Sequence, residues 1–297
     1  MKRGKSFSRT LWYQHQSIPS VDSQIVPDVG VLMKRRLTGR QKIVNPQVDF
    51  HLHTMSSSYN AARALLLGDG TTLSKLEYFA IEGAAEQVRI ALSVVGIPFD
   101  DVFIPIAEWN QTKKAATKFG QLPELTLPNG RIVTDSMAML RLAGEADEEG
   151  KLYPHEIVAR TSVESALGLV GDLSRAWRPM IYMSMYPEAY GHPTKEEWAD
   201  ADATIQKLRT GFVKSDLPRF MGYFTILIKE NGGNFLTGED LTIADIAAYQ
   251  AINYYRRGVA DHVPIDCLDS FPEILAWMAR VEGHPKVAAY KASKAAK

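Results

Sequence analysis

The sequence predicts a small α/β domain followed by an all-helical domain, in a chain of 297 residues. Three observations carry this prediction. Short apolar runs bounded by Gly, Pro and Asn dominate residues 75–147, as strands and hairpins require. Beyond Pro154, apolar residues recur with the 3.6-residue period of a helix. Between the two lies Asp147–Pro154, a charged segment with Gly and Pro that is typical of a linker.

The first half of the α/β domain is expected to be a βαβ unit. Leu76–Ile81 favours a strand, and Gly83 ends it. Helical spacing then appears at Val88, Ala91, Leu92 and Val95. Phe99–Ile106 is a second run of strand length. A strand, a helix and a strand within about 30 residues predict a right-handed crossover between parallel strands.

The second half is expected to be a hairpin and a helix. The Lys- and Ala-rich segment 111–118 comes first and favours a short helix. Glu124–Leu127 and Arg131–Val133 are predicted strands, and the Asn-Gly pair between them favours a tight hairpin. After Asp135, one face of a predicted helix is formed by Met139, Leu142, Ala143 and Ala146. The predicted order is therefore βαβ, a short helix, and ββα.

The rest of the chain is expected to be helical. Helical period is kept by three groups: Val163, Ala166, Leu167 and Val170; Ile205, Leu208 and Phe212; and Phe271, Ile274, Leu275 and Met278. Thr242-Ile-Ala-Asp245 is a capping-box pattern that opens a further helix. Pro218 inside a helical pattern predicts a break or kink. We place the α/β domain at 73–147 and the helical domain at 148–297.

Composition narrows the classes of protein. Hydrophobic residues make up 45% and charged residues 23% of the chain, and no apolar run reaches the ~20 residues of a membrane-spanning helix, so we expect a soluble protein with no membrane partner. Residues 1–60 hold nine Lys/Arg and three Asp/Glu, which leaves the remainder mildly acidic and disfavours nucleic-acid binding. The single cysteine, Cys267, excludes an intrachain disulfide and fits the cytoplasm, a reducing compartment.

Residues 1–72 lack sustained periodicity and are expected to be an extension. They are basic and carry no acidic residue before Asp22, which is typical of an organelle transit peptide. A disordered tail, or an upstream extension with Met55 as the functional start, is the alternative. His51 and His53 could ligate a metal, but an isolated His-x-His in a basic tail is usually coincidental, so we expect no metal site.

Pro123 lies directly before the first strand of the hairpin. In a thioredoxin-like fold, which the βαβ–ββα order predicts, a proline at this point is commonly cis. The backbone groups of Leu122 then face outward at a sheet edge, where an extended peptide can pair with them like an added strand. The alternative is that Pro123 only begins the strand.

Six segments in this order resemble motifs of the cytosolic glutathione transferases, nearest to the tyrosine-type classes (sigma, mu, pi and alpha). They are KLEYFAIEGAAEQVR (75–89), EWNQTKKAATKFGQLP (108–123), DSMAML (135–140), GKLYP (150–154), FLTGEDLTIAD (235–245) and CLDSFPEILAWMARVEGHPKVAAY (267–290). The resemblance covers 75–293 and leaves 1–72 unmatched. It implies a detoxification enzyme, a homodimer that conjugates glutathione, its co-substrate, to small hydrophobic electrophiles.

The resemblance also assigns the catalytic residue. Tyr78 matches the family's catalytic tyrosine, whose phenol donates a hydrogen bond to the glutathione sulfur. A free thiol has a pKa of about 8.5, and a donor that favours the charged form lowers this pKa. The alternative is a tyrosine that only packs in the core. Tyr182 and Tyr186 are candidates for lining the pocket of the electrophile.

Further residues match contacts of the bound peptide. Trp109 and one of Lys113 or Lys114 match the residues that hold the glycine carboxylate. The other matches, at the γ-glutamyl end and the sheet edge, are Gln121, Leu122, Pro123, Asp135 and Ser136. A carboxylate is favoured at the helix start where Ser136 lies, and Asp135 can pair with the amine. The alternatives are loop packing for the tryptophan, solvated lysines, and an ordinary helix cap for the Asp-Ser pair.

Two positions depart from the family pattern. Where the tyrosine classes carry an Arg near the sulfur pocket, this chain has Ala84, and Glu82 lies two positions before it. The missing cation is expected to weaken thiolate stabilisation. The alternative function is therefore a non-catalytic homologue that binds glutathione or hydrophobic compounds, or a structural subunit. A glutathione-dependent isomerase, such as a prostaglandin synthase, would use the same thiolate.

Two residues match subunit contacts of the family. Phe119 matches the aromatic residue that inserts into a partner subunit, and Glu164 matches the acid that meets the partner's ligand.

Overall fold

The computed structural model describes residues 58–295. Residues 1–57, which include His51 and His53, and residues 296–297 lie outside the described part. The helix over 58–67 falls in the segment that the sequence assigned to the extension, yet it belongs to the main hydrophobic core. Ala62 and Leu66, one helical turn apart, are both buried there.

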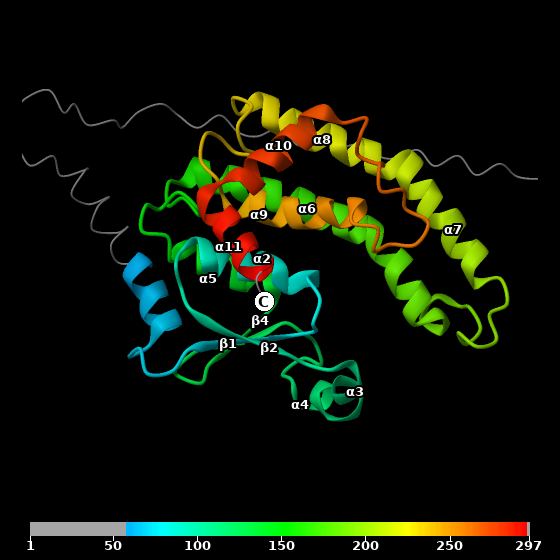
Figure 1. Ribbon diagram of the computed structural model, residues 1–297, viewed down its shortest axis with the longest axis horizontal. Coiled ribbons are helices and arrows are strands. Elements are labelled where there is room, and N and C mark those ends of the chain that lie inside the picture. Colours follow the sequence, from blue (N-terminus) through cyan, green and yellow to red (C-terminus); the bar gives the residue numbers. More distant parts are fainter. Residues whose placement is uncertain (1–57, 296–297) are drawn as a thin grey trace, which may run out of the picture. The chain divides into compact units, whose positions relative to one another are not determined.

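The α/β domain contains a four-stranded sheet in the order β2-β1-β3-β4. Strand β1 (Ser74–Tyr78) pairs in parallel with β2 (Phe99–Phe103), and α2 (Glu86–Val94) makes the predicted crossover between them. Strand β3 (Glu124–Thr126) pairs antiparallel with both β1 and β4 (Ile132–Thr134). The predicted βαβ–ββα order is confirmed (Figure 1).

The first strand ends earlier than the apolar run 76–81 predicted. The chain turns after Tyr78, where the N–H of Ile81 donates to the carbonyl of Phe79 at 2.7 Å. Phe79 and Ile81 are therefore in a loop, although their side chains are of the strand-forming kind. This early turn places Tyr78 at the end of the strand, where its side chain meets the residues that follow.

The two faces of β1 meet different elements, because alternate residues of a strand point to opposite faces. Leu76 and Tyr78 face α2 and α5 (Ser136–Glu145), which lie between the sheet and the helical domain (Figure 1). Glu77 faces the opposite way and contacts Lys113. That face is covered by three short elements: α3 (Ile106–Glu108), the π-helical turn η2 (Trp109–Lys113) and α4 (Lys114–Ala116).

The remainder of the described chain is helical, as predicted. Its elements are α6 (Ile157–Met185), η3 (Pro187–Tyr190), α7 (Ala201–Gly211), the π-helical turn η4 (Phe212–Asp216), α8 (Leu217–Glu230), α9 (Ile243–Arg256), α10 (Pro272–Gly283) and α11 (Pro285–Ala295). A break or kink was predicted at Pro218, but the helix is not broken there. Helix α7, η4 and α8 follow one another without interruption, and Pro218 lies in the first turn of α8 directly after the π-helical turn. The capping box at Thr242 and Asp245 is present.

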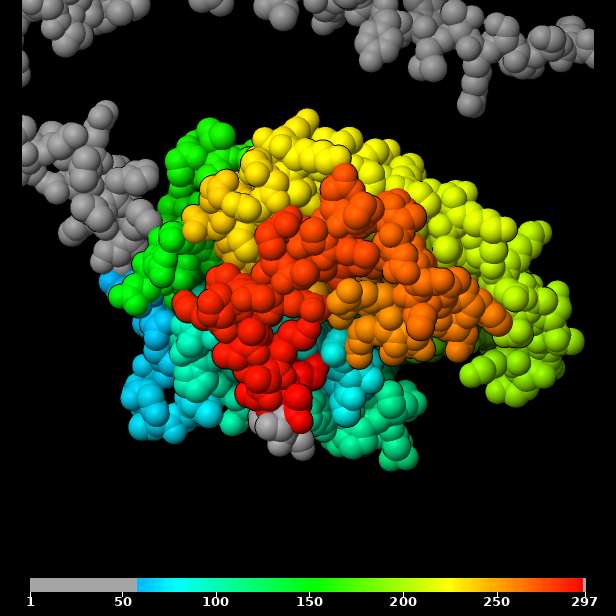
Figure 2. Space-filling model, turned by 45° about the horizontal axis from the view of Figure 1, so that its top comes forward, coloured from blue at the N-terminus to red at the C-terminus, as the bar shows by residue number. Residues whose placement is uncertain are grey.

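Helix α9 joins the two parts of the described chain. It packs against α6 within the helical domain and against α2 and α5 of the α/β domain. Helix α11 returns to the α/β domain and packs on α2. In Figure 2 the C-terminal helices, in orange and red, cover this face of the molecule. The domain boundary at residue 147 stays a prediction, because these contacts make the described residues one compact unit.

Candidate active site

Tyr78 is the last residue of β1 and is only 9% exposed. Its hydroxyl oxygen accepts a hydrogen bond from the backbone N–H of Ala84 at 3.1 Å. Burial raises the pKa of Tyr78 above its ordinary value, so the phenol is protonated at neutral pH. An oxygen that accepts from a backbone amide keeps its own O–H available, and the phenol is therefore held as a hydrogen-bond donor.

A tight turn, Glu82–Ala84, packs directly against this phenol. Gly83 has a φ of +41°, which disfavours residues with a Cβ atom. A Cβ atom at Gly83 would also lie 2.4 Å from the Tyr78 hydroxyl oxygen. Glycine is thus required here both by the backbone conformation and by the close approach of the tyrosine.

The structure gives Ala84 a role that the sequence did not reveal. Its missing side-chain cation was expected to weaken the site, but its backbone N–H is the group that holds the phenol. A cation is present elsewhere: the guanidinium of Arg89 lies 5.9 Å from the centre of the Tyr78 ring. Its positive charge offsets part of the increase that burial causes in the pKa of Tyr78, which stays above its ordinary value. Arg89 also donates to Asp101 at 2.9 Å.

Tyr182 of α6 also acts on the phenol. It is close enough to raise the pKa of Tyr78 electrostatically, and 38% of its side chain is exposed. Its ring lies 6.2 Å from that of Tyr186, which is also exposed. The structure therefore brings Tyr182 near Tyr78, with Tyr186 beside it, and the assignment of both to an electrophile pocket stays a prediction.

Trp109 is buried and reaches the tyrosine through a second aromatic ring. Its ring meets Phe79 edge-on at 5.7 Å, and Phe79 lies 5.3 Å from Tyr78. Lys113, one turn further along, donates to the Glu77 carboxylate at 2.7 Å, whereas Lys114 is exposed.

The Lys113–Glu77 ion pair is close, at 2.7 Å, and acts on the pKa of Glu77. Burial acts to raise the pKa of Glu77, but the ammonium groups of Lys113 and Lys75 outweigh burial and hold this pKa below its ordinary value. Lys113 is therefore charged, and Glu77 already balances part of that charge. The two lysines face different surroundings, and the choice between them for the glycine carboxylate stays a prediction.

The peptide bond between Leu122 and Pro123 is cis, as predicted. Pro123 is buried, Leu122 is half-buried and Gln121 is exposed. Directly after them, the Glu124 carboxylate accepts the N–H of Lys118 at 2.9 Å. These residues form the loop that leads into β3.

Asp135 caps α5, and one of its carboxylate oxygens accepts the N–H groups of Met137 and Ala138, both at 3.0 Å. The ordinary cap is therefore present. It takes up two of the N–H groups that an anion could bind at this helix start. The N–H and O–H of Ser136 are the groups that can still face a ligand there.

Gln87 is a site residue that the sequence analysis missed. Its side chain, 8% exposed, donates to the Ser136 hydroxyl oxygen at 3.0 Å. As with Tyr78, a hydroxyl oxygen that accepts from the protein keeps its own proton for another acceptor. Gln87 lies on α2 only three residues after Ala84, which precedes the helix, so the short stretch 84–87 contacts both hydroxyls. Its partner is 49 residues away, and no local pattern announces the contact.

We predict that Gln87→Ala weakens glutathione binding about 3- to 10-fold, because a neutral hydrogen bond contributes about 0.5–1.5 kcal/mol. The turnover rate at saturating glutathione is expected to change little, since Tyr78 is untouched. Calorimetric titration and steady-state rates measure the two effects. Gln206→Ala on α7 is the matched control, because Gln206 is exposed. Equal affinities in the two variants would contradict the role given to Gln87.

Two residues matched to subunit contacts differ in their surroundings. Phe119 is 63% exposed, as an inserting aromatic residue would be in a single chain. Glu164 instead has partners in its own chain. Its carboxylate accepts hydrogen bonds from Nε of Arg141 at 2.8 Å and from Nη2 of the same residue at 2.6 Å. It also accepts the hydroxyl of Tyr153 at 2.6 Å.

The described part of the chain shows neither a metal site nor a membrane-spanning helix. Between residues 58 and 295, no group of three or more His, Cys, Asp or Glu side chains could hold a metal ion. Over the same residues, none of the helices is long and apolar enough to cross a membrane. Burial raises the pKa of Cys267 to about 11, so this thiol is not a reactive one.

Fold and site together define a thioredoxin-like domain with a donor tyrosine, followed by a helical domain. Residues 192–294 match the family described as glutathione S-transferase, C-terminal domain. A glutathione S-transferase of Dirofilaria immitis is 28% identical over 223 residues, which are 74% of this chain and 92% of the relative. S-crystallin 4 of Enteroctopus dofleini is 28% identical over 72% of this chain and 94% of its own.

A solved structure shares the fold. Prostaglandin synthase D of Nilaparvata lugens superposes with a TM-score of 0.60 at 24% identity, covering 73% of this chain and 96% of its own. Several further relatives carry the name glutathione S-transferase. The chain is a homologue of the glutathione S-transferases, and these named relatives support its assignment as a transferase enzyme.

Proposed function

We propose that the chain is a glutathione transferase in which Tyr78 activates the thiol of glutathione for addition to small hydrophobic electrophiles. The observation that carries this proposal is the 3.1 Å hydrogen bond from the N–H of Ala84 to the Tyr78 oxygen. The protonated phenol can then donate to the sulfur. A donor to the thiolate lowers the thiol pKa below its free value of about 8.5.

The tripeptide would lie along the edge that carries the predicted binding residues. At the γ-glutamyl end, Ser136 offers its N–H and its hydroxyl to the carboxylate, and the free oxygen of Asp135 can accept from the amine. Gln121 lies on the same side by its match to the family. The backbone of Leu122, before Pro123, pairs with the peptide in the manner of an added strand.

At the glycine end, the carboxylate would meet Trp109 and Lys113 or Lys114. The indole N–H of Trp109 is a donor, and a lysine supplies the positive charge. Lys113 is already near Glu77, so it would serve the ligand while keeping part of that ion pair. Lys114 is exposed and its charge is free to turn toward the ligand.

The reaction itself needs few protein groups. The thiol releases its proton to solvent, and the thiolate sulfur forms a bond to the electrophilic carbon. With an aryl halide, the halide departs with the electron pair of its bond. Tyr78 keeps its proton throughout and acts only by the hydrogen bond to sulfur. Tyr182 and Tyr186 would contact the apolar body of the electrophile. The same thiolate would serve an isomerase.

A non-catalytic glutathione- or hydrophobe-binding homologue is the second candidate. Glu82 and Ala84 favour it, because the tyrosine-type classes carry an arginine near the sulfur pocket and this turn carries none. S-crystallin 4, a relative of similar identity that does not carry the name of a transferase, also supports this candidate. The proposal of catalysis rests on the backbone N–H of Ala84 and on Arg89 in place of that arginine.

The two candidates differ in a measurement on the unchanged chain. Calorimetric titration with glutathione and adduct formation with a generic aryl halide are both expected to be positive for the transferase. Binding without a rate above the uncatalysed reaction would favour the non-catalytic homologue. If glutathione does not bind, both the transferase and the glutathione-binding homologue are excluded.

We further propose a role in detoxification, a cytoplasmic location and a homodimer in which Phe119 inserts into the partner.

A further inference from the structure

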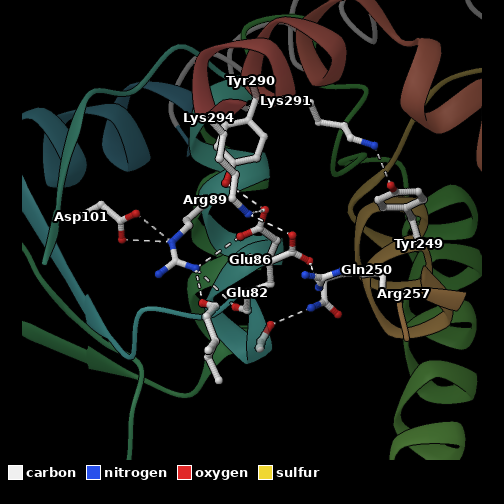
Figure 3. A network of polar contacts seen from close by, with 12 residues as sticks. Glu82, Glu86, Arg89, Asp101, Tyr249, Gln250, Arg257, Tyr290, Lys291 and Lys294 are labelled. Carbon is white, nitrogen blue, oxygen red and sulfur yellow. Dashed lines mark hydrogen bonds and ion pairs between the residues drawn. The ribbon is translucent and has the colours of Figure 1, made fainter. Parts of the chain in front are cut away.

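The turn that holds the phenol is itself held by the helical domain. The side-chain amide of Gln250 on α9 donates to the carbonyl of Gly83 at 2.8 Å, across 167 residues of chain. Arg257, directly after α9, pairs with the carboxylate of Glu82. Figure 3 shows both side chains reaching from α9 toward the start of α2.

The carbonyl that Gln250 contacts belongs to the same peptide unit as the N–H that contacts Tyr78. In a planar trans peptide the C=O and the N–H point in opposite directions, so fixing the oxygen of Gly83 also aims the N–H of Ala84. A donor to the carbonyl polarises the peptide and strengthens its N–H as a donor. One peptide unit therefore connects Gln250, at 2.8 Å, with the Tyr78 oxygen, at 3.1 Å.

Cations around Glu82 explain why this turn can carry an acidic residue. Besides Arg257, its carboxylate pairs with Lys294 of α11 at 3.1 Å (Figure 3). Lys294 also pairs with Glu86 at 2.7 Å, and Glu86 accepts the hydroxyl of Tyr290 at 3.0 Å. The charge of Glu82 is thus balanced by cations of the helical domain, so that Glu82 anchors the turn.

Two other carbonyls at the turn are bound by Arg89, a residue of the same α/β domain. Arg89 donates to the carbonyl of Ile81 at 3.0 Å and to that of Glu82 at 3.3 Å. The carbonyls of residues 81, 82 and 83 are therefore each bound, the first two by Arg89 and the last by Gln250. Of these side-chain contacts, only that of Gln250 reaches the peptide unit that faces the phenol, whose carbonyl also accepts the backbone N–H of Glu86.

We propose that Gln250, supported by Arg257, is a positioning residue for the reaction, through which the helical domain sets the strength of the hydrogen bond from Tyr78 to sulfur. This inference rests on the proposed function. It assigns to α9 a role in thiol activation in addition to its packing. The hydrogen bonds run from Gln250 to the Gly83–Ala84 peptide, to the Tyr78 oxygen, and from the Tyr78 proton to the sulfur.

The test is Gln250→Met, which keeps the length of the side chain but removes its N–H donors without adding charge. The pKa of the bound thiol is expected to rise by about 0.5 to 1, because one neutral hydrogen bond in the chain of donors is lost. The turnover rate below that pKa is expected to fall about 3- to 10-fold, while KM for glutathione changes less than about twofold. The thiolate absorbance in the ultraviolet, titrated with glutathione bound, measures the pKa.

Gln206→Met on α7 is the matched control, since the same exchange is made at an exposed glutamine. A purely structural role for Gln250 would lower the melting temperature but leave the thiol pKa as it is. If Gln250→Met does not fold, Arg257→Met tests the other anchor, with a smaller rise of the pKa expected. A folded variant with the unchanged pKa and rate would overturn the inference.

The same titration on Tyr78→Phe separates this inference from the proposed function. If Tyr78→Phe raises the thiol pKa and Gln250→Met does not, only the positioning role fails. If bound glutathione in the unchanged chain already has the pKa of a free thiol, the proposed function fails, and the positioning role fails with it.

Discussion

A Tyr78→Phe variant is expected to conjugate glutathione to an aryl halide about 10- to 100-fold more slowly than the unchanged chain at neutral pH. This range follows from the loss of a hydrogen bond to a charged group, which contributes about 1.5–3 kcal/mol. Binding of glutathione is expected to persist, because the contacts at both ends of the peptide are untouched. Steady-state rates and calorimetric titration measure the two properties.

The loss of rate in Tyr78→Phe is expected to depend on pH. The reactive form is the thiolate, so the rate rises as pH passes the pKa of the bound thiol. Tyr78 lowers that pKa, and its removal returns it toward about 8.5. The difference between variant and unchanged chain should therefore be largest at acidic pH and shrink at pH above about 9. A constant ratio of rates across pH would show that the phenol does not act on thiol ionisation.

Asp245→Ala is expected to lower the free energy of unfolding by about 3 kcal/mol or more. The carboxylate is completely buried and accepts from the N–H of Leu236 at 2.8 Å and the indole N–H of Trp277 at 2.9 Å. It also accepts the N–H of Thr242 at 3.0 Å and its hydroxyl at 2.9 Å. The alanine variant leaves these donors unpaired in the core, and each unpaired donor costs about 1–3 kcal/mol.

The midpoint of urea unfolding measures this loss, and Asp240→Ala is its control. Asp240 is nearby and acidic, but its side chain is 53% exposed and pairs with Lys151 at the surface. Its replacement should change the unfolding free energy by no more than about 0.5 kcal/mol. Equal midpoints for the two variants would mean that the buried carboxylate does not stabilise the fold. Because Asp245 opens α9, its loss should also disturb Gln250 on the same helix.

Much of the fold followed from local patterns. The alternation of short apolar runs with Gly, Pro and Asn predicted the βαβ–ββα order of the α/β domain, and the 3.6-residue period predicted the helices. The pattern Thr242-Ile-Ala-Asp245 predicted the start of α9 correctly, because a capping box forms between residues only three apart. The end of β1 was predicted three residues too late, since Phe79 and Ile81 favour strands by residue type, whereas the turn there is fixed by contacts with α2 and Arg89.

The site was predictable where a family motif carried it. Tyr78, the loop before Pro123 and the cap at Asp135 lie in segments whose order and spacing resemble a known family, and their roles in binding a ligand stay predictions. Gln87 and Gln250 were not found, because glutamine has many uses and neither residue is part of a recognisable short pattern.

The sequence by itself determined the order of elements, the helix caps and the presence of a tyrosine in the first strand. These properties depend on residues that are neighbours in the chain. Only the tertiary structure decided that the backbone of Ala84 holds the phenol, that Gln87 orients Ser136, and that Gln250 fixes the turn between them. These contacts join residues 6, 49 and 167 positions apart, and their geometry follows from how α2 and α9 pack rather than from any local preference.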